Sequence, residues 1–310
     1  MKLRHLTSIT DLTASEIKKI INRAIILKKQ LKSNRKAKKL LTTKSLAMIF
    51  EKPSLRTRIS FEIGMTQLGG HAIYLGPSDI QMGTREPVED IAKVTSSMVD
   101  IIMARTFSHD SITKLARYST VPVINGLSDL EHPCQILADL MTIYENKKTF
   151  NRLKIAYVGD CENNVTHSLA LASSILGINF SCATPDGYFM KKEISQMANK
   201  IAIKTKSEII ESDNPEGVVK NSDVVITDTW VSMGDEKEKK KRLKIFTKYQ
   251  VNNKLMSLAK KNAIFMHCLP AYRGNEVTSD VIDGEKSVVF QEAENRLHAQ
   301  KALILFLLNL

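Results

Sequence analysis

Cysteine, aromatic residues and long apolar runs are scarce in this 310-residue sequence. The four cysteines are scattered without CxxC spacing, which excludes a disulfide-stapled miniature and favours a reducing compartment. No stretch approaches the ~20 apolar residues that span a membrane, and the first ten residues lack the apolar run of a signal peptide. We therefore expect a cytoplasmic protein without a membrane partner.

The motifs that hold common cofactors are also missing. The chain has neither GxGxxG nor GxxxxGK[ST], so it lacks the glycines of a dinucleotide site and of a P-loop. It has no HExxH and no pair of histidines or carboxylates at metal-ligand spacing. We therefore expect no metal and no other cofactor.

Positive charge is in excess, with 45 Lys and Arg residues against 33 Asp and Glu residues, a formal net charge of +12. Much of the excess lies in two runs, Lys28–Lys39, which continues a helix, and Lys237–Lys244, which we expect in a loop. Aromatic residues make up 6% of the chain and are not interleaved with either run, which disfavours stacking on nucleic acid. A solvated basic surface or a small anionic substrate is the favoured interpretation. The nucleic-acid alternative predicts steeply salt-dependent binding that survives replacement of Arg56 and His132.

Short apolar runs alternate with helix-like stretches, a pattern typical of parallel sheets covered on both faces. We expect an α/β protein with two doubly wound parallel-sheet domains rather than one closed barrel. The first domain covers residues 1–144 with a C-terminal helix at 291–310 that packs back on it, and the second covers 145–290. The expected strands are Leu46–Phe50, Ala72–Leu75, Ile101–Ala104, Val121–Ile124, Ile155–Val158, Phe180–Ala183, Val224–Thr227 and Ile264–Met266. The expected helices include a capped one after Thr13, and Arg58–Leu68, Pro133–Tyr144, Val165–Leu176 and Asn253–Lys260.

Ligands of open α/β sheets bind beyond the carboxyl ends of the strands, so the residues that follow each expected strand are the candidates. In the first half of the chain these residues are mainly cationic, and in the second half they are mainly amides, carboxylates and thiols. The candidate segments are 51–58, 105, 125–135, 159–164, 228–234 and 267–270.

The segment Ser54–Arg58 lies at a strand-to-helix junction, where backbone N–H groups and the helix dipole suit a phosphate. It is equally compatible with an ordinary N-cap that carries exposed arginines. Arg105 directly follows a strand and offers either a second fork-shaped donor to the same anion or a surface ion pair.

Three further candidates also have two interpretations each. His132 and Gln135 stand at a helix start marked by a proline, either as neutral hydrogen-bond donors in a cleft or as a structural cap. Asp228, after an apolar strand, suits a substrate ammonium or belongs to a charged loop. Cys268 is either a site thiol or a small buried apolar residue.

Five segments, in their order and spacing, resemble the ornithine carbamoyltransferases over essentially the whole chain. They are Phe50–Arg58, His132–Gln135, Asp228–Gly234, His267–Pro270 and Glu292–Arg296. Leu55 is a departure, because many members of that family have Thr in this position. The backbone N–H is retained there, so the departure concerns only a hydroxyl contact.

The resemblance implies transfer of the carbamoyl group of carbamoyl phosphate to the δ-amine of L-ornithine, giving L-citrulline and phosphate, in arginine biosynthesis. Direct attack without a metal or a covalent intermediate is implied, with Arg105, His132 and Cys268 as the catalytic residues. The implied ligands of carbamoyl phosphate are Ser54, Leu55, Arg56, Thr57, Gln81, Arg105, His132, Gln135, Cys268, Leu269 and Arg296.

The resemblance further implies that ornithine is bound by Asn164, Asp228, Ser232 and Met233. It also implies a homotrimer or a multiple of trimers with sites between subunits, where the loop that holds Gln81 and Arg85 contributes across the boundary.

Other carbamoyl acceptors are the alternatives within the enzyme class. Aspartate requires cationic groups where this chain has Asp228 and Asn164. Putrescine lacks the α-amino and carboxylate groups that these residues suit, and an acylated ornithine needs additional room. A panel of acceptors discriminates between these possibilities.

Overall fold

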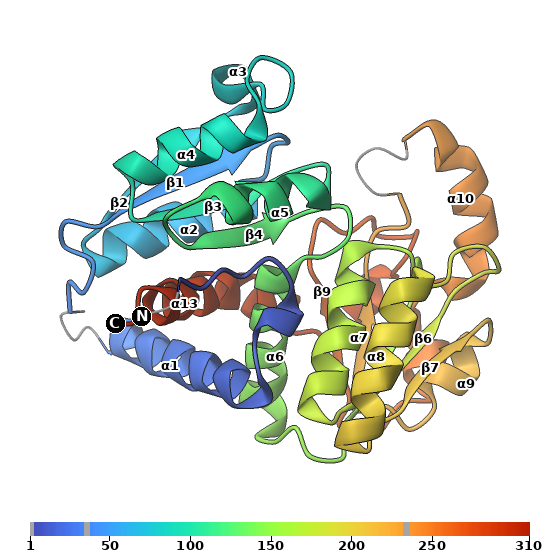
Figure 1. The fold of residues 1–310 in the computed structure, drawn as a ribbon. Helices are drawn as coiled ribbons and strands as arrows, with labels where there is room; N and C mark the ends of the chain where they lie inside the picture. Colours follow the sequence, from blue (N-terminus) through green and yellow to red (C-terminus); the bar gives the residue numbers. More distant parts are fainter. Residues whose placement is uncertain (1–2, 34–37, 232–235) are drawn as a thin grey trace. The chain divides into compact units, whose positions relative to one another are not determined.

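The computed structural model describes residues 3–33, 38–231 and 236–310 (Figure 1). The chain divides into two compact units, Met1–Met141 with Glu294–Leu310 (unit 1) and Thr142–Ala293 (unit 2). The expected domain limits, 144/145 and 290/291, lie three residues from these divisions. Both divisions fall inside helices, α6 (Pro133–Lys147) and α13 (Val289–Leu307).

The sheet of unit 1 is parallel and has the strand order β2-β1-β3-β4. Its strands are β1 (Ser45–Phe50), β2 (His71–Leu75), β3 (Ile101–Arg105) and β4 (Val123–Leu127). The central strands β1 and β3 are buried almost throughout, as continuous apolar runs covered on both faces should be. The chain order reverses between β1 and β3, and such a switch point is where open α/β sheets bind ligands.

Helices cover this sheet, and their starts follow from the sequence. α1 begins at the predicted capping box, in which Thr13 Oγ1 accepts from Glu16 N and the Glu16 carboxylate accepts from Thr13 N. α4 and α5 place Ile91 and Ile112 in one apolar cluster with Ile102 of β3. The helices before α6 are η1 (Ile9–Asp11), α1 (Ala14–Lys32), α2 (Leu55–Leu68), α3 (Pro77–Ile80), α4 (Val88–Met98) and α5 (His109–Tyr118).

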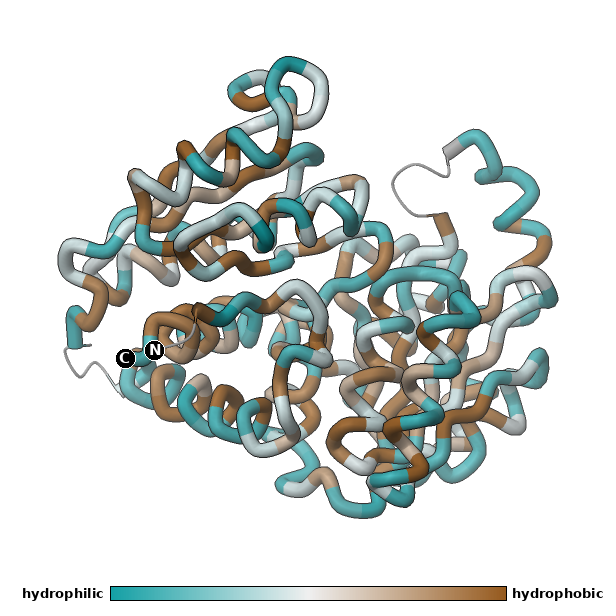
Figure 2. Tube along the Cα trace, viewed as in Figure 1, coloured by the Kyte–Doolittle hydropathy of each residue, from teal (hydrophilic) through white to brown (hydrophobic). Residues whose placement is uncertain are grey.

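The C-terminal helix α13 belongs largely to unit 1, because residues 294–310 cluster with the first part of the chain. Figure 2 shows its hydrophobic character, and residues 302–305 are fully buried. The expectation that the last helix packs back on the first domain is confirmed.

Unit 2 contains a second parallel sheet, in the order β7-β6-β5-β8-β9. Its strands are β5 (Lys154–Val158), β6 (Asn179–Ala183), β7 (Ile209–Ser212), β8 (Val224–Thr227) and β9 (Ile264–His267). Here the chain order reverses between β5 and β8, which is the switch point of this sheet. The prediction of two open sheets rather than one barrel is confirmed.

The helices of unit 2 enclose an aromatic core. Phe246 contacts Tyr188, Trp230 and Tyr249, with ring centroids 4.9, 5.9 and 6.2 Å away. The elements are α7 (Asn164–Leu176), α8 (Lys192–Thr205), α9 (Pro215–Val219), η2 (Glu236–Glu238), α10 (Lys239–Ile245), η3 (Phe246–Tyr249), α11 (Asn253–Met256) and α12 (Ser279–Ile282).

Several local predictions are wrong. The basic segment 237–244, expected in a loop, forms the end of η2 and most of α10, with its lysines exposed and Arg242 buried. The helix expected over 253–260 ends at Met256. β7 was not predicted, since this four-residue edge strand is only partly buried. β4 starts two residues later than expected and includes Asn125, which was placed after the strand.

Among the described residues, no helix combines the length and the apolar composition required to cross a membrane.

Candidate active site

Cationic side chains gather at the switch point of the unit 1 sheet. Phe50 of β1 and Arg105 of β3 are paired at the ends of their strands, and Glu51 N donates to the Arg105 carbonyl oxygen at 2.9 Å. The segment that follows β1 therefore starts beside Arg105. Only 6% of Arg105 is exposed, so its charge is largely removed from bulk water.

The N-terminus of α2 lies in this segment. Ser54 is the N-cap, and its Oγ accepts a hydrogen bond from Thr57 N at 3.3 Å. The first turn of such a helix combines N–H donors with the positive end of the helix dipole, which suits an anion. Leu55 is the first helical residue and is 69% exposed, so the apolar side chain at this position needs no room in the core.

Arg296 of α13 connects two other segments of unit 1. Its Nη1 donates to Gln135 Oε1 at 2.6 Å, and its Nη2 donates to Thr57 Oγ1 at 3.1 Å. Gln135 in turn donates to Asp139 Oδ1 at 2.8 Å. Arg296 is only 3% exposed. Residues from α2, α6 and α13 therefore form one buried network, in which the Gln135 amide is held by its neighbours.

His132 lies directly before α6 and is only 5% exposed. Burial lowers the pKa of His132 well below its ordinary value, and the positive charges of Arg296, Arg105, Lys52 and Arg56 lower it further. The imidazole is therefore neutral near pH 7. Four cations thus act electrostatically on one neutral ring, and three of them were predicted as site residues. We refer to these five residues as the cationic cluster.

Lys52 is the member of the cationic cluster that was not predicted as a site residue. It is 8% exposed, and its Nζ lies 4.9 Å from the centroid of the Phe107 ring. Burial lowers the pKa of Lys52, and the charge of Arg105 lowers it further. The signal for Lys52 was its position in the segment after β1, two residues beyond the strand.

Gln81 and Arg85 lie on an exposed turn after α3. Gln81 is the C-cap of α3 and has a φ of 46°, in the left-handed region. Their expected contribution to carbamoyl phosphate binding stays a prediction.

In unit 2, the carboxyl ends of β5, β8 and β9 lie next to one another. Tyr157 pairs with Ile226, and Thr227 pairs with His267. The residues that follow these strands, 159–164, Asp228 and Cys268, are therefore brought to one edge of the sheet.

Asp228 and Cys268 form the centre of this second cluster. Asp228 Oδ1 accepts from Thr229 N at 2.8 Å and from the Cys268 thiol at 3.1 Å. Burial raises the pKa of Asp228, while His267 and the thiol oppose the shift. Cys268 is half-buried, whereas the other three cysteines are buried. Its thiol faces the Asp228 carboxylate.

His267 and Leu269 flank this thiol. Leu269 has a φ of 59°, and its N–H donates to His267 Nδ1 at 2.9 Å. Left-handed conformations are uncommon for branched residues and concentrate at functional sites. Nε2 of His267 lies 3.3 Å from Glu276 Oε1.

Asp228, His267 and Cys268 each offer one possible metal-ligand atom, and these atoms lie within 4.8 Å of one another. Both ring nitrogens of His267 already have partners, on Leu269 and Glu276, so the three side chains belong to a hydrogen-bonded network. The expectation that the site needs no metal stays a prediction.

Asn164, a predicted ornithine ligand, is the half-buried first residue of α7. The preceding Asn163 is the N-cap, and its Oδ1 accepts from Thr166 N at 2.8 Å. Ser232 and Met233, the other two predicted ornithine ligands apart from Asp228, lie outside the described residues.

Comparison with protein families assigns a role to each half of the chain. The family model described as the carbamoyl-P binding domain of aspartate/ornithine carbamoyltransferase matches residues 4–145. The model described as the Asp/Orn binding domain of the same enzymes matches residues 151–307. Together with two open parallel sheets and a polar cluster at each switch point, these matches define a carbamoyltransferase with two α/β domains.

Relatives match along the full chain. The ornithine carbamoyltransferase of Halalkalibacterium halodurans is 50% identical over 99% of this chain and 96% of its own length. That of Methanosarcina acetivorans is 52% identical over 98% of this chain and 99% of its own. The solved structure of the Pyrococcus furiosus ornithine carbamoyltransferase superposes with a TM-score of 0.94 at 49% identity, covering 97% of this chain and 96% of that one. The chain belongs to the aspartate/ornithine carbamoyltransferase family, as the resemblance of its motifs predicted.

Proposed function

We propose that this enzyme transfers the carbamoyl group of carbamoyl phosphate to the δ-amine of L-ornithine. The amine nitrogen attacks the carbonyl carbon, the bond from that carbon to the phosphate oxygen breaks, and the proton lost by the amine passes to the departing phosphate. The products are L-citrulline and phosphate. No metal and no covalent intermediate is required, because the acyl phosphate already carries a good leaving group.

The observation that carries the proposal is the buried network in which Arg296 donates to Gln135 at 2.6 Å and to Thr57 at 3.1 Å. The charges of the cationic cluster act on His132, which is 5% exposed. A dianionic phosphate requires positive charge, whereas a carbamoyl carbonyl requires neutral or charged hydrogen-bond donors at its oxygen. In this proposal Ser54, Leu55, Arg56, Thr57 and Arg105 bind the phosphate. Their support is the capped start of α2 in the segment that leaves β1 beside Arg105.

His132 and Gln135 are proposed to bind the carbamoyl group, together with Arg105. Negative charge grows on the carbonyl oxygen as the amine attacks, and preorganised donors stabilise it. Arg296 supports this role of Gln135, because it donates to Gln135 Oε1 at 2.6 Å and so orients the side-chain amide. Cys268 and Leu269, at the end of β9, are proposed to contact the same group, and Cys268 to assist proton transfer.

The acceptor is proposed to bind at the carboxyl ends of β5 and β8. Asp228 suits the α-ammonium group of ornithine, with Asn164, Ser232 and Met233 as further ligands. The attacking δ-amine must be neutral, although such amines have a pKa near ~10.4 in water. In this proposal the guanidinium groups of the phosphate site lower that pKa by like-charge repulsion and so activate the nucleophile.

The experiment that tests this function is citrulline formation by the purified protein with a panel of acceptors at saturating carbamoyl phosphate. We expect L-ornithine to be used with the highest kcat/KM. A preference for aspartate, putrescine or an acylated ornithine would refute the assignment.

We also propose a trimeric, cytoplasmic enzyme of arginine biosynthesis. α2 exposes Ile59 and Ile63 one helical turn apart, with 52% and 42% of each residue exposed, and apolar surface of this kind supports contact with another subunit. In a trimer, Gln81 and Arg85 are proposed to reach the carbamoyl phosphate of a neighbouring subunit. Light scattering during size-exclusion chromatography measures the molar mass in solution, and a monomeric mass at the assay concentration would refute the trimer.

A further inference from the structure

One side chain in the basic segment 237–244 is buried. Arg242 of α10 has 8% of its side chain exposed, whereas Lys239, Lys240 and Lys241 are exposed. A buried guanidinium cannot release its proton, so its lost hydration must be replaced by protein partners. The partners of Arg242 therefore indicate what it does.

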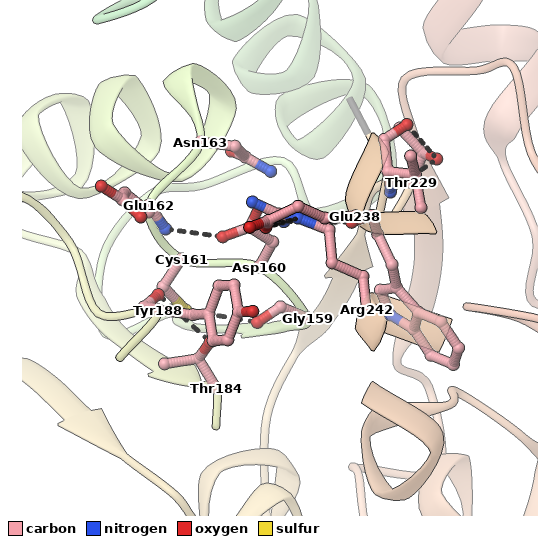
Figure 3. Close-up of polar contacts among 12 residues, drawn as sticks. Gly159, Asp160, Cys161, Glu162, Asn163, Thr184, Tyr188, Thr229, Glu238 and Arg242 are labelled. Carbon is pink, nitrogen blue, oxygen red and sulfur yellow. Dashed lines mark hydrogen bonds and ion pairs between the residues drawn. The ribbon is translucent and has the colours of Figure 1, made fainter. Parts of the chain in front are cut away.

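Arg242 bonds two separate segments of unit 2. Its Nη1 donates to Asp160 Oδ2 at 2.7 Å and to the carbonyl oxygen of Trp230 at 3.1 Å. Figure 3 shows the guanidinium at the Asp160 carboxylate, with the Tyr188 ring close by, and its carbon lies 5.0 Å from the centroid of that ring. Its Nε lies 3.6 Å from Oε2 of Glu238, the N-cap residue of α10.

Asp160 belongs to the turn that leads from β5 into α7. Its Oδ1 accepts from Glu162 N at 3.0 Å, and its backbone carbonyl accepts from the Thr166 hydroxyl at 3.2 Å (Figure 3 shows the first of these). Asn163, at the end of this turn, is the N-cap of α7. The Asp160 carboxylate thus orders the residues directly before Asn164.

Trp230 belongs to the segment after β8, two residues beyond Asp228. Its ring stacks on Phe246 at a centroid distance of 5.9 Å. Gly159 has a φ of 140°, and a Cβ there would lie 3.6 Å from the Trp230 indole nitrogen. The turn after β5 and the segment after β8 therefore lie close together, and Arg242 bonds to both of them.

The electrostatics of the pair indicate an orienting contact. Burial raises the pKa of Asp160 and the charge of Arg242 opposes that rise, which leaves the pKa at about 6, so the carboxylate is ionised near neutral pH. Buried ion pairs of this kind give little net stability compared with apolar residues of similar volume. Their contribution is the geometry that they impose on their partners.

We propose that Arg242 is a positioning residue for the acceptor site: one guanidinium holds the turn before Asn164 and the segment after Asp228 at the separation that ornithine requires. This inference rests on the proposed function, which assigns Asn164 and Asp228 to ornithine. The phosphate ligands of carbamoyl phosphate are assigned to unit 1, so its binding should not depend on the contacts of Arg242.

The test is steady-state kinetics of Arg242→Gln, Arg242→Lys and Asp160→Asn in the full-length protein. Loss of a hydrogen bond from a charged group corresponds to about tenfold or more in an equilibrium constant, so we expect R242Q to raise the KM for ornithine by about that factor. We expect the KM for carbamoyl phosphate to remain within about twofold. R242K, which keeps the charge but loses the fork, should recover part of the ornithine affinity.

Arg273→Gln is the matched control. Arg273 lies in the same unit and makes a two-point ion pair with Asp283 at 2.9 and 2.7 Å, but 42% of its side chain is exposed. R273Q should leave both KM values unchanged, because it removes an arginine ion pair that touches neither acceptor segment.

Two results overturn the proposal: an unchanged ornithine KM in R242Q, or an equal rise of both KM values, which indicates a general loss of structure. Circular dichroism melts identify a variant that does not fold. In that case R242K and D160N carry the same comparison. Failure of the proposed function is seen separately, in the acceptor panel, as a preference of the wild-type protein for another acceptor. The KM for that acceptor then replaces the KM for ornithine in the comparison of variants.

Discussion

Replacing Arg296 by Gln removes a guanidinium that joins α2, α6 and α13 in unit 1. The arginine is 3% exposed and donates to Gln135 Oε1 at 2.6 Å and Thr57 Oγ1 at 3.1 Å. Each hydrogen bond from a charged group contributes about 1.5–3 kcal/mol. The loss of one such contribution corresponds to about 10- to 150-fold in binding. We expect the KM for carbamoyl phosphate to rise by a factor in this range.

Stability should change less than binding. Removal of Arg296 costs its hydrogen bonds to Gln135 and Thr57, but it also removes the repulsion between Arg296 and the other cations of the cationic cluster. Lys301→Gln is the control on the same helix, because Lys301 donates to Gln67 Oε1 at 2.6 Å and makes no contact with Thr57 or Gln135 among the described residues. We expect K301Q to leave the KM for carbamoyl phosphate unchanged.

The pKa of His132 provides a second measurement on the Arg296→Gln protein. Arg296 is the largest electrostatic cause of the lowered His132 pKa, after burial itself. R296Q should therefore raise that pKa toward its ordinary value but leave it below, because burial remains. Nuclear magnetic resonance titration of the imidazole signals measures the shift, with His132→Asn to assign the signal. An unchanged KM for carbamoyl phosphate together with an unchanged His132 pKa would refute the reasoning.

Three further predictions concern the two clusters. Arg105→Ala should lower kcat by about 100-fold or more in a citrulline assay, since a preorganised donor to the developing oxyanion is lost; near-normal turnover would contradict this role. Asp228→Asn should raise the KM for ornithine while leaving carbamoyl phosphate binding, measured by calorimetry, intact; loss of both would indicate misfolding instead. The free energy of unfolding should fall as pH drops below about 6.5, by up to about 1.4 kcal/mol per pH unit for each proton that the unfolded chain binds and the folded site excludes at His132. Urea titrations at pH 7 and 5.5 should show a smaller decrease in His132→Asn than in the wild type or in the exposed-site control His71→Asn, and equal decreases would contradict the assignment.

Much of the fold and part of the candidate site could be predicted from local sequence. Apolar runs such as residues 46–50 and 101–104 are long enough to form buried strands, and the polar residues after them must lie at a carboxyl edge of a parallel sheet. The positions of Arg105 and Asp228 at strand ends follow from this rule alone. The capping box at Thr13 is equally local, because its partners are three residues apart.

Local patterns failed where burial depends on distant segments. β7 lies at a sheet edge with half-exposed residues, so it has no continuous apolar run. Residues 237–244 are too charged to indicate a packed helix, yet Arg242 is buried because Asp160, 82 residues away, supplies its counter-charge. Lys52 was not predicted, because its burial and its contact with the Phe107 ring cannot be seen in a local pattern.

The sequence by itself determined which residue types stand at the ends of the strands, and therefore the chemistry available to each half of the molecule. Only the tertiary structure decided which of them meet. Strand order placed Phe50 beside Arg105, and the return of α13 brought Arg296 to Thr57, 239 residues away. The physical reason is that apolar runs and the polar segments between them specify local structure, whereas the pairing of strands and the burial of charge depend on the free energy of the whole unit.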